Sequence, residues 1–166
     1  MATAPEHFAP LPEVAIRPMA EGDVSTVVDI ERASYSFPWS EGIFRDCLRV
    51  GYVCQVALQA GTVIGYGIVS TGAGEAHILN LCVCAELRCR GIGSLLLEDL
   101  LQCAAATAVE TAYLEVRPSN TAAIRLYQSF QFQHIGTRRG YYQAPDGRED
   151  AAVFKLALRS RRARTG

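Results

Sequence analysis

The stretch Ile78–Leu97 reads ILNLCVCAELRCRGIGSLLL, and it decides the fold that we expect for the chain. It begins with an apolar run, Ile78–Cys84, which is typical of a buried strand. A polar turn follows at Ala85–Arg90. Gly91 and Gly93 then open a leucine-rich segment whose apolar residues have helical spacing. The stretch therefore predicts a strand, a turn and a helix.

The start of this predicted helix has the features of an anion site. Glycines there let a ligand approach the backbone, and the unpaired N–H groups favour negative charge. Arg88 and Arg90 add positive charge. The lysine of a P-loop and the third glycine of a dinucleotide fingerprint are both missing. The remaining pattern, Arg88-x-x-Gly91-x-Gly93, is by itself also compatible with an ordinary glycine-rich turn.

Length and composition indicate one globular domain. The chain has 166 residues, of which 49% are apolar and 20% charged, so it can bury a sizeable core. Its net charge of −1 argues against general nucleic-acid binding, and we expect none. We divide the chain into a loosely ordered segment at 1–13, a domain at 14–158 and a solvated basic tail at 159–166.

The cysteine pattern and the apolar segments indicate the cellular compartment that we expect for the protein. Six cysteines are scattered through the chain without the paired spacing of a zinc site, and the three histidines form no cluster in the sequence. Neither a signal peptide nor a run long enough to span a membrane is visible. We therefore expect free thiols, no bound metal, and a monomer in the cytoplasm without membrane contact.

The other elements follow from apolar periodicity and from residues that break it. We predict strands at Val14–Arg17, Tyr52–Leu58, Thr62–Ser70, Ala112–Val116, Gln133–Arg139 and Asp150–Leu158, and helices capped by Asp23, Ser40 and Asn120. This order predicts an α/β fold with one mixed, mostly antiparallel sheet and helices on both faces. The strands at Ile78–Cys84 and Ala112–Val116 are joined through a helix, so we expect them to run parallel.

Four local sequences together resemble one superfamily. They are FPWS at Phe37–Ser40, ILNLCV at Ile78–Val83 with the glycine loop after it, LEVRPSNTAAIRLY at Leu114–Tyr127 and RRGYYQAPDGREDA at Arg138–Ala151. Over residues 14–158 the chain resembles the GNAT N-acetyltransferases, and among them the bacterial enzymes that acetylate the N-terminal alanine of a small-subunit ribosomal protein. It departs from their pattern at Gly140, where asparagine is usual, and at Cys84-Ala85-Glu86, where an aspartate-proline turn is usual.

This resemblance implies a co-substrate and places for two ligands. In these enzymes the two parallel strands splay apart, and the pantetheine arm of acetyl-CoA lies in the gap. The residues that it implies for the cofactor are Leu81, Cys82, Val83, Arg88, Cys89, Arg90, Gly91, Ile92, Gly93, Ser94 and Asn120. The acceptor, the N-terminus of a ribosomal protein, would enter a slot lined by Phe37, Trp39, Tyr141 and Tyr142.

Acetyl transfer to an amine needs two proton movements. An α-amine with a pKa of about 7.7–8.0 is mostly protonated at neutral pH and must lose a proton, while the leaving thiolate must gain one. The resemblance implies that Glu115 is the base and Tyr127 the acid. Judged alone, Glu115 also fits the exposed side of an amphipathic strand, and Tyr127 also fits a core position. Asn120 could hydrogen-bond the cofactor but equally fits a helix cap, and the amides of Leu81–Val83 could polarise the thioester carbonyl but equally fit ordinary strand pairing.

Two other functions stay open on the sequence. The chain could acetylate a different amine, such as lysine or a small metabolite, or it could bind acyl-CoA without catalysis. Glu115 and Tyr127 beside an intact loop argue against the second, and the FPWS and GREDA stretches favour the ribosomal acceptor over the first. Glu31 is a further candidate to pair with the acceptor amine, although a glutamate on a helix is ordinarily solvated.

Overall fold

Seven strands and four helices make up the part of the chain that this computed structural model describes, residues 13–158. The strands are β1 (Val14–Pro18), β2 (Val53–Gln59), β3 (Thr62–Gly72), β4 (Glu75–Val83), β5 (Thr111–Val116), β6 (Gln133–Ala144) and β7 (Gly147–Ala157). The helices are α1 (Val24–Ser34), α2 (Glu41–Arg49), α3 (Ile92–Ala105) and α4 (Thr121–Ser129), and the short 3-10 turns are η1 (Glu21–Asp23) and η2 (Ala85–Leu87). Apart from Glu13, the predicted N-terminal segment and basic tail lie outside the described residues.

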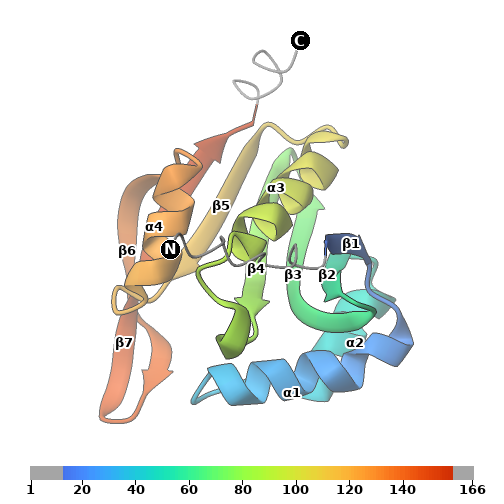
Figure 1. Ribbon diagram of the computed structural model, residues 1–166. Coiled ribbons are helices and arrows are strands. Elements are labelled where there is room, and N and C mark those ends of the chain that lie inside the picture. Colours follow the sequence, from blue (N-terminus) through green and yellow to red (C-terminus); the bar gives the residue numbers. More distant parts are fainter. Residues whose placement is uncertain (1–12, 159–166) are drawn as a thin grey trace, which may run out of the picture.

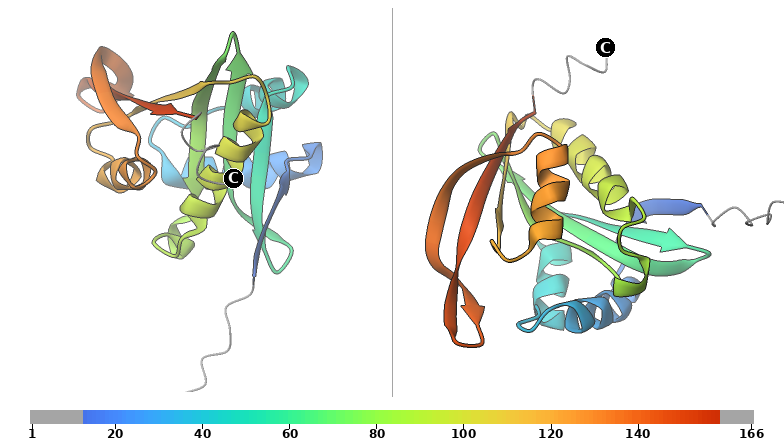
Figure 2. Two further views of the ribbon diagram at one scale, coloured as in Figure 1. Left: turned by 90° about the horizontal axis from the view of Figure 1, so that it is seen from above. Right: turned by 60° about the vertical axis from the view of Figure 1, so that its left-hand side comes forward.

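The strands form a single sheet in the order β1-β2-β3-β4-β5-β7-β6. Only β4 and β5 are parallel, and α3 connects them, whereas every other neighbouring pair is antiparallel. Figures 1 and 2 show α3 and α4 over one face and α1 and α2 over the other. The predicted mixed, mostly antiparallel sheet with helices on both faces is confirmed.

Each face of the sheet buries its own apolar core because strand residues alternate between the faces. The core under α1 and α2 contains Val24, Val27, Phe44, Val56, Tyr66 and Ile68. The core under α3 and α4 contains Leu97, Leu100, Leu101, Leu114, Val116, Tyr127 and Phe154. Leu114 and Val116 thus point toward α4, and Glu115 between them points to the opposite face.

Two glycines of β3 let α3 lie close to the sheet. A Cβ atom at Gly67 would lie 2.5 Å from Leu100 Cδ1, and one at Gly65 would lie 2.9 Å from the carbonyl oxygen of Cys82. Neither approach is possible for a larger residue without movement of the helix or of β4. The glycines therefore fix the position of α3, whose first turn faces the point where β4 and β5 separate.

The pairing of β4 with β5 is short. It runs from Glu75 opposite Thr111 to Ile78 opposite Leu114 and then stops. At the same point β4 bulges against β3, because Ile78 and Asn80 oppose adjacent β3 residues and Leu79 is left over. Beyond the bulge, β4 stays with β3 while β5 stays with β7, so a gap opens between the two parallel strands.

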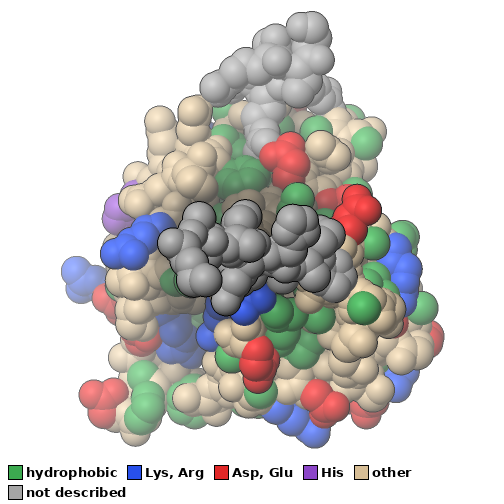
Figure 3. Space-filling view, viewed as in Figure 1, with side chains coloured by type: hydrophobic (Ala, Val, Ile, Leu, Met, Phe, Trp, Pro, Cys, Tyr) green, Lys and Arg blue, Asp and Glu red, His purple; other side chains and the backbone are tan. Residues whose placement is uncertain are grey.

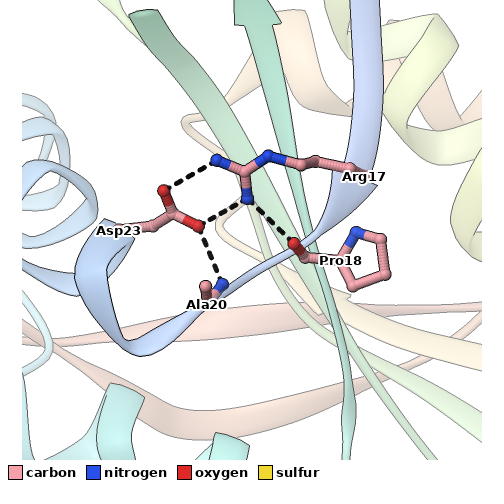
Figure 4. A network of polar contacts seen from close by, with 4 residues as sticks. All are labelled: Arg17, Pro18, Ala20 and Asp23. Atoms are coloured by element: carbon pink, nitrogen blue, oxygen red, sulfur yellow. Dashed lines mark hydrogen bonds and ion pairs between the residues drawn. The ribbon is translucent and has the colours of Figure 1, made fainter.

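The predicted capping of the first helix by Asp23 is wrong in its mechanism. Asp23 stands just before α1, but its side chain makes no cap hydrogen bond because its own backbone is already helical. Its carboxylate instead accepts the Ala20 N–H at 2.7 Å and pairs with Arg17 at 2.7 and 3.0 Å (Figure 4). The hydrogen bond from Arg17 also holds the pKa of Asp23 below its usual value. The residue ties β1 to η1.

The other two predicted caps are present. Ser40 Oγ accepts the Ile43 N–H at 3.3 Å, and Asn120 Oδ1 accepts the Ala123 N–H at 3.2 Å. The strand ends differ more from prediction. β4 begins three residues earlier than expected, and β6 and β7 extend into a long hairpin whose register shifts between Arg138 and Tyr142. A bulge carries the pairing past Arg139, where we expected the strand to end.

Surface charge is mixed. Basic and acidic side chains are interspersed with hydrophobic ones on the face seen in Figure 3, in keeping with the net charge of −1. None of the helices within residues 13–158 is both long and apolar enough to cross a membrane.

Candidate active site

A cavity of about 540 Å³ lies at the gap, between the end of β4, the start of α3 and the start of α4. All but one of the predicted cofactor residues line it: Leu81, Cys82, Val83, Arg88, Cys89, Gly91, Ile92, Gly93, Ser94 and Asn120. The exception is Arg90, which is exposed and lies outside the lining. We call this space the cofactor cavity.

The loop before α3 has the backbone geometry of an anion site. Gly91 adopts a left-handed conformation with φ +82°, which a residue with a side chain rarely takes. The first N–H groups of α3, at Ile92, Gly93 and Ser94, have no partner within an α-helix and lie at this cavity. Clustered donors at a helix start suit a pyrophosphate, so the residues present fit the phosphate part of acetyl-CoA.

Arg88 braces the same loop. Its Nε donates to the carbonyl of Val83 at 3.1 Å, and its Nη2 donates to Ser34 Oγ at 3.0 Å. The guanidinium therefore joins the end of β4 to the end of α1 and brings a positive charge to the cavity wall. Sequence reasoning predicted the charge but not the bracing role.

The backbone of β4 presents amides to the gap. The N–H of Cys84 donates to the β3 residue Ile64 at 2.8 Å. Amides alternate sides along an antiparallel strand, so the amide of Cys82 also faces β3, while those of Leu81 and Val83 face the gap. Tyr35 donates to the Leu81 carbonyl at 3.4 Å from that same side. Two of the three predicted amides are thus directed at the place expected for a thioester carbonyl.

A second cavity of about 450 Å³ adjoins the first on the side of α1 and the β6–β7 hairpin. Of the predicted acceptor residues, Phe37, Trp39 and Tyr142 line it. Tyr141 does not; it is exposed and packs edge-on against Tyr142, with ring centroids 4.8 Å apart. We call this space the acceptor cavity. Both cavities are bordered by Ser34, Tyr35, Leu81, Arg117, Ser119, Asn120, Ala123 and Tyr127.

Glu31 forms part of the acceptor cavity wall and is buried, so the expectation of an ordinary solvated glutamate is wrong. Its carboxylate accepts the backbone N–H of Trp39 at 3.0 Å and the amide of Asn80 at 3.1 Å. The hydroxyl of Tyr66 donates to it as well. These donors come from three separate segments and hold a negative charge where the FPWS stretch meets the sheet.

Glu115 lies at the gap on the face of β5 turned away from α4, and it lines the acceptor cavity. Nε2 of His77 contacts one of its carboxylate oxygens, and Nη1 of Arg138 lies 3.0 Å from the other. Burial alone would raise the pKa of Glu115, but the interactions with His77 and Arg138 outweigh it and keep that pKa below its ordinary value. The carboxylate is therefore ionised at neutral pH.

Tyr127 approaches the same gap from the opposite face, since α4 lies over the core that contains Leu114 and Val116. It lines both cavities, and its ring packs edge-on against Phe132 at 5.8 Å between centroids. Burial, together with the nearby Cys82, raises the pKa of the Tyr127 phenol above its ordinary value. The hydroxyl thus stays protonated at neutral pH, as a proton donor must.

The GREDA stretch, Gly147–Ala151, holds the turn between β5 and α4 in place. Glu149 pairs with Arg117 at 3.1 Å and accepts the N–H of Ser119 at 3.2 Å, so it fixes the turn between β5 and α4. The guanidinium of Arg117 lies 4.4 Å from the ring centre of Tyr142. Sequence reasoning named the stretch but not these contacts, and the signal for Arg117 was its place between Glu115 and Asn120.

Gly140, where the resemblance departs from its pattern, sits in the hairpin bulge with φ +58°. Asparagine tolerates this left-handed conformation better than most residues, and glycine tolerates it freely. Asp150 accepts the Gly140 N–H at 2.8 Å, and Arg148 donates to its carbonyl at 2.7 Å. The substitution therefore preserves the backbone shape beside Tyr141 and Tyr142.

The cysteine side chains are free thiols. The six cysteines are unpaired in disulfide bonds, and three of them, Cys47, Cys54 and Cys82, are buried. Burial raises the pKa of Cys54 to about 12, so that thiol is unreactive at neutral pH. Within residues 13–158, the His, Cys, Asp and Glu side chains form no group of three or more that could hold a metal ion.

Comparison with known proteins gives the same family as the geometry. Residues 24–132 match the acetyltransferase (GNAT) family. The chain is 36% identical over 136 residues to the [ribosomal protein bS18]-alanine N-acetyltransferase of Escherichia coli K12, covering 82% of this chain and 92% of that one. It is 34% identical over 144 residues to the enzyme of the same name from Haemophilus ducreyi, covering 86% and 99%.

A solved structure agrees. The crystal structure of the ribosomal-protein-S18-alanine N-acetyltransferase from Escherichia coli has a TM-score of 0.82 to this fold at 34% identity, covering 88% of this chain and 94% of that one. The fold is that of an acyltransferase. The chain belongs to the GNAT acetyltransferase family, whose members use acetyl-CoA.

Proposed function

We propose that this protein transfers the acetyl group of acetyl-CoA to the α-amine of the N-terminal alanine of a small-subunit ribosomal protein. The observation that carries the proposal is the meeting of the two cavities at the β4–β5 gap, with Glu115 and Tyr127 on opposite sides of it. Curated relatives with 34–36% identity are named for this reaction on bS18.

Acetyl-CoA binds in the cofactor cavity. The N–H groups of Ile92, Gly93 and Ser94 and the charge of Arg88 hold the pyrophosphate. The apolar residues along β4 and α4 suit the pantetheine arm. The amides of Leu81 and Val83 then face the thioester carbonyl and stabilise the negative charge that develops on its oxygen during attack.

The acceptor enters from the other cavity. Phe37, Trp39 and Tyr142 line its path, and the buried carboxylate of Glu31 gives the cavity a fixed negative charge that favours a protonated amine. At the gap, Glu115 takes one proton from the α-ammonium, because its ionised carboxylate faces the cavity. The free amine then attacks the acetyl carbonyl directly, and the attack needs no acyl-enzyme.

The leaving thiolate is protonated from the other side of the gap. As the tetrahedral intermediate collapses, the C–S bond breaks and the sulfur takes the proton of the Tyr127 hydroxyl, while the second proton that the attacking nitrogen loses restores that hydroxyl. The buried phenol has a raised pKa, so it remains protonated until the thiolate forms.

We propose that the protein works as a monomer. Its net charge of −1 also favours the absence of direct contact with nucleic acid.

The test uses two peptides. The first begins with alanine and copies the N-terminus of bS18, and the second has the same sequence with a blocked N-terminus and one added free lysine. We expect mass spectrometry to find one acetyl group on the α-amine of the first and none on the second. Comparable turnover of the two peptides would indicate an acetyltransferase of a different amine. Acetyl-CoA binding without turnover of either would indicate a binding module.

A further inference from the structure

The carboxylate of Glu115 has two polar side-chain partners within residues 13–158. They are His77 on β4 and Arg138 on β6, one at each carboxylate oxygen. A base that takes a proton in every cycle must also lose it again, and the route for that proton depends on what the base touches.

The two partners differ in what they can do with a proton. The guanidinium of Arg138 cannot be deprotonated in a protein, so it can only orient the carboxylate. It also lies 4.7 Å from the ring centre of Tyr141, which holds it in place. An imidazole can accept a proton at one nitrogen and release one at the other. Of the two, only His77 can carry the proton onward.

Exposure points the same way. The side chain of Glu115 is 9% exposed, whereas that of His77 is 36% exposed and directly contacts it. The imidazole therefore connects a nearly buried carboxylate with water at the open face of the sheet. When an acceptor peptide fills the acceptor cavity, the carboxylate loses its other side of access to solvent.

The surroundings of His77 are charged but open. It pairs across the sheet with Ser70 of β3 and Tyr113 of β5. Titratable or charged groups on this face of β4, β5, β6 and β7 include Glu75, Tyr113, Glu115, Arg138, Tyr142, Glu149 and Lys155, whose Nζ lies 5.9 Å from the Tyr113 ring centre. Glu115 is the one in direct contact with the imidazole.

We propose that His77 is a proton relay that returns Glu115 to its ionised form in each catalytic cycle. The inference rests on the proposed function, in which Glu115 is the base. The acceptor ammonium gives one proton to the Glu115 carboxylate, and the resulting carboxylic acid gives one proton to Nε2 of His77. The imidazolium then releases one proton to water. One proton passes from the amine to solvent, the Glu115 carboxylate is restored, and the imidazole regains its starting tautomer by proton exchange with water.

The experiment compares two substitutions of His77 in the full chain. His77→Gln keeps an amide that can donate to Glu115 but cannot pass a proton on, and His77→Ala leaves a space that a small base can enter. Turnover of the alanine peptide is measured in dilute buffer from pH 6 to 9, with and without added imidazole. We expect kcat to fall about tenfold in both variants, less than the loss of the base itself because water can replace a relay in part. The KM for peptide and the Kd for acetyl-CoA should be unchanged.

Added imidazole gives the sharpest readout. It should restore kcat in His77→Ala toward the wild-type value, and it should leave Glu115→Gln unaffected. In the double variant Glu115→Gln/His77→Gln, kcat should be no lower than in Glu115→Gln alone, because the relay has nothing to carry once the base is gone.

Failure of the relay is distinguishable from failure of the proposed function. The relay is overturned if wild-type protein acetylates the peptide, Glu115→Gln is impaired, and His77→Gln keeps wild-type kcat in dilute buffer. It is equally overturned if both His77 variants are impaired and imidazole restores neither, since His77 then only holds Glu115 in place. Inactivity of the wild-type protein on the peptide would count against the proposed function instead.

Discussion

The two cavities that meet at the β4–β5 gap are built in different ways. The cofactor cavity comes mainly from one contiguous stretch, the end of β4 and the start of α3, and its chief donors are backbone N–H groups. The acceptor cavity gathers side chains from α1, the loop after it, β4, β5 and the β6–β7 hairpin. One side depends on backbone shape, the other on side-chain pairs between distant segments.

This difference predicts how each side responds to substitution. A change in backbone conformation or bulk should harm the cofactor side most. On the acceptor side the carboxylates Glu31, Glu115 and Glu149 each contact two or more polar groups. Loss of a single carboxylate there should alter chemistry or acceptor binding while acetyl-CoA still binds.

The largest effect on acetyl-CoA binding is expected from Gly91→Glu. The backbone at this position is left-handed, with φ +82°, and a residue with a side chain disfavours that conformation. The glutamate also brings a negative charge to the predicted pyrophosphate site. Calorimetry should show at least a hundredfold weaker binding of acetyl-CoA, because strain and charge repulsion each cost about 1–2 kcal/mol or more.

Gly74→Glu is the matched control for this change. Gly74 has φ +78°, and a Cβ atom added there, as at Gly91, would meet no other part of the chain within 4 Å. It lies in the β3–β4 turn, away from both cavities. Its variant should bear the same strain and bind acetyl-CoA normally. Undiminished affinity in Gly91→Glu would place the cofactor elsewhere.

The cofactor side was also the more predictable one from sequence. A strand, a turn and two glycines lie within Ile78–Leu97, so local periodicity and helix-start physics were enough to find it. The parallel pairing of β4 and β5 followed from the intervening helix. The predicted order of elements, the single mixed sheet and its fold family all agree with the structure.

The acceptor side could not be predicted in the same way. Glu31 has the pattern of a solvated helical residue, and its burial depends on Tyr66 and Asn80, which are 35 and 49 residues away in the chain. His77 and Glu115 meet across two strands, and no local spacing records that contact. Asp23 does not cap α1 because its own backbone is helical, and its carboxylate binds Arg17 and Ala20 instead.

The largest effect on turnover is expected from Glu115→Gln, which keeps the size of the side chain but removes the base. The value of kcat should fall by about 10²–10⁴ at pH 7. Activity should recover in part as the pH rises above about 8, where the α-amine loses its proton unaided. Steady-state kinetics from pH 6 to 9.5 checks this, with Glu75→Gln, an exposed carboxylate on β4 outside both cavities, as the control. A wild-type pH profile at a lower level would mean that Glu115 only positions the acceptor.

Glu115 also affects stability in a pH-dependent way. Because its pKa is lowered in the folded protein, the ionised carboxylate stabilises the fold above the unfolded value of about 4.3, and this contribution is lost as the pH falls through the lower folded value. Urea unfolding should therefore show wild type and Glu115→Gln farther apart in free energy of unfolding at pH 7 than at pH 3. A constant difference would argue against the stabilising contacts of Glu115 with His77 and Arg138.

A smaller loss is expected from Tyr127→Phe. The substitution removes only a hydroxyl, so the leaving thiolate must take its proton from water, and kcat should fall by about a hundredfold. The Kd for acetyl-CoA, measured by calorimetry, should stay within about twofold because the ring still fills its place beside Phe132. Tyr52→Phe, on an exposed tyrosine outside both cavities, should be neutral. If Tyr127→Phe keeps kcat within a few-fold of wild type, the tyrosine is a core residue and not the acid.

The smallest effect is expected from Glu149→Gln, which weakens the contact between the β6–β7 hairpin and the β5–α4 turn. Its pairing with Arg117 is partly exposed, so the loss should be at most about 1 kcal/mol, or about a fivefold rise in the peptide KM. Because such a pair is screened by salt, the difference from wild type should shrink between about 0.05 and 0.5 M NaCl. Glu41→Gln, which breaks an exposed pair with Arg45 on α2, should leave the KM unchanged at either salt concentration. A fall in kcat without a rise in the peptide KM would show that Glu149 acts on the reacting groups. Acceptor positioning and proton transfer would then not be divided between different carboxylates.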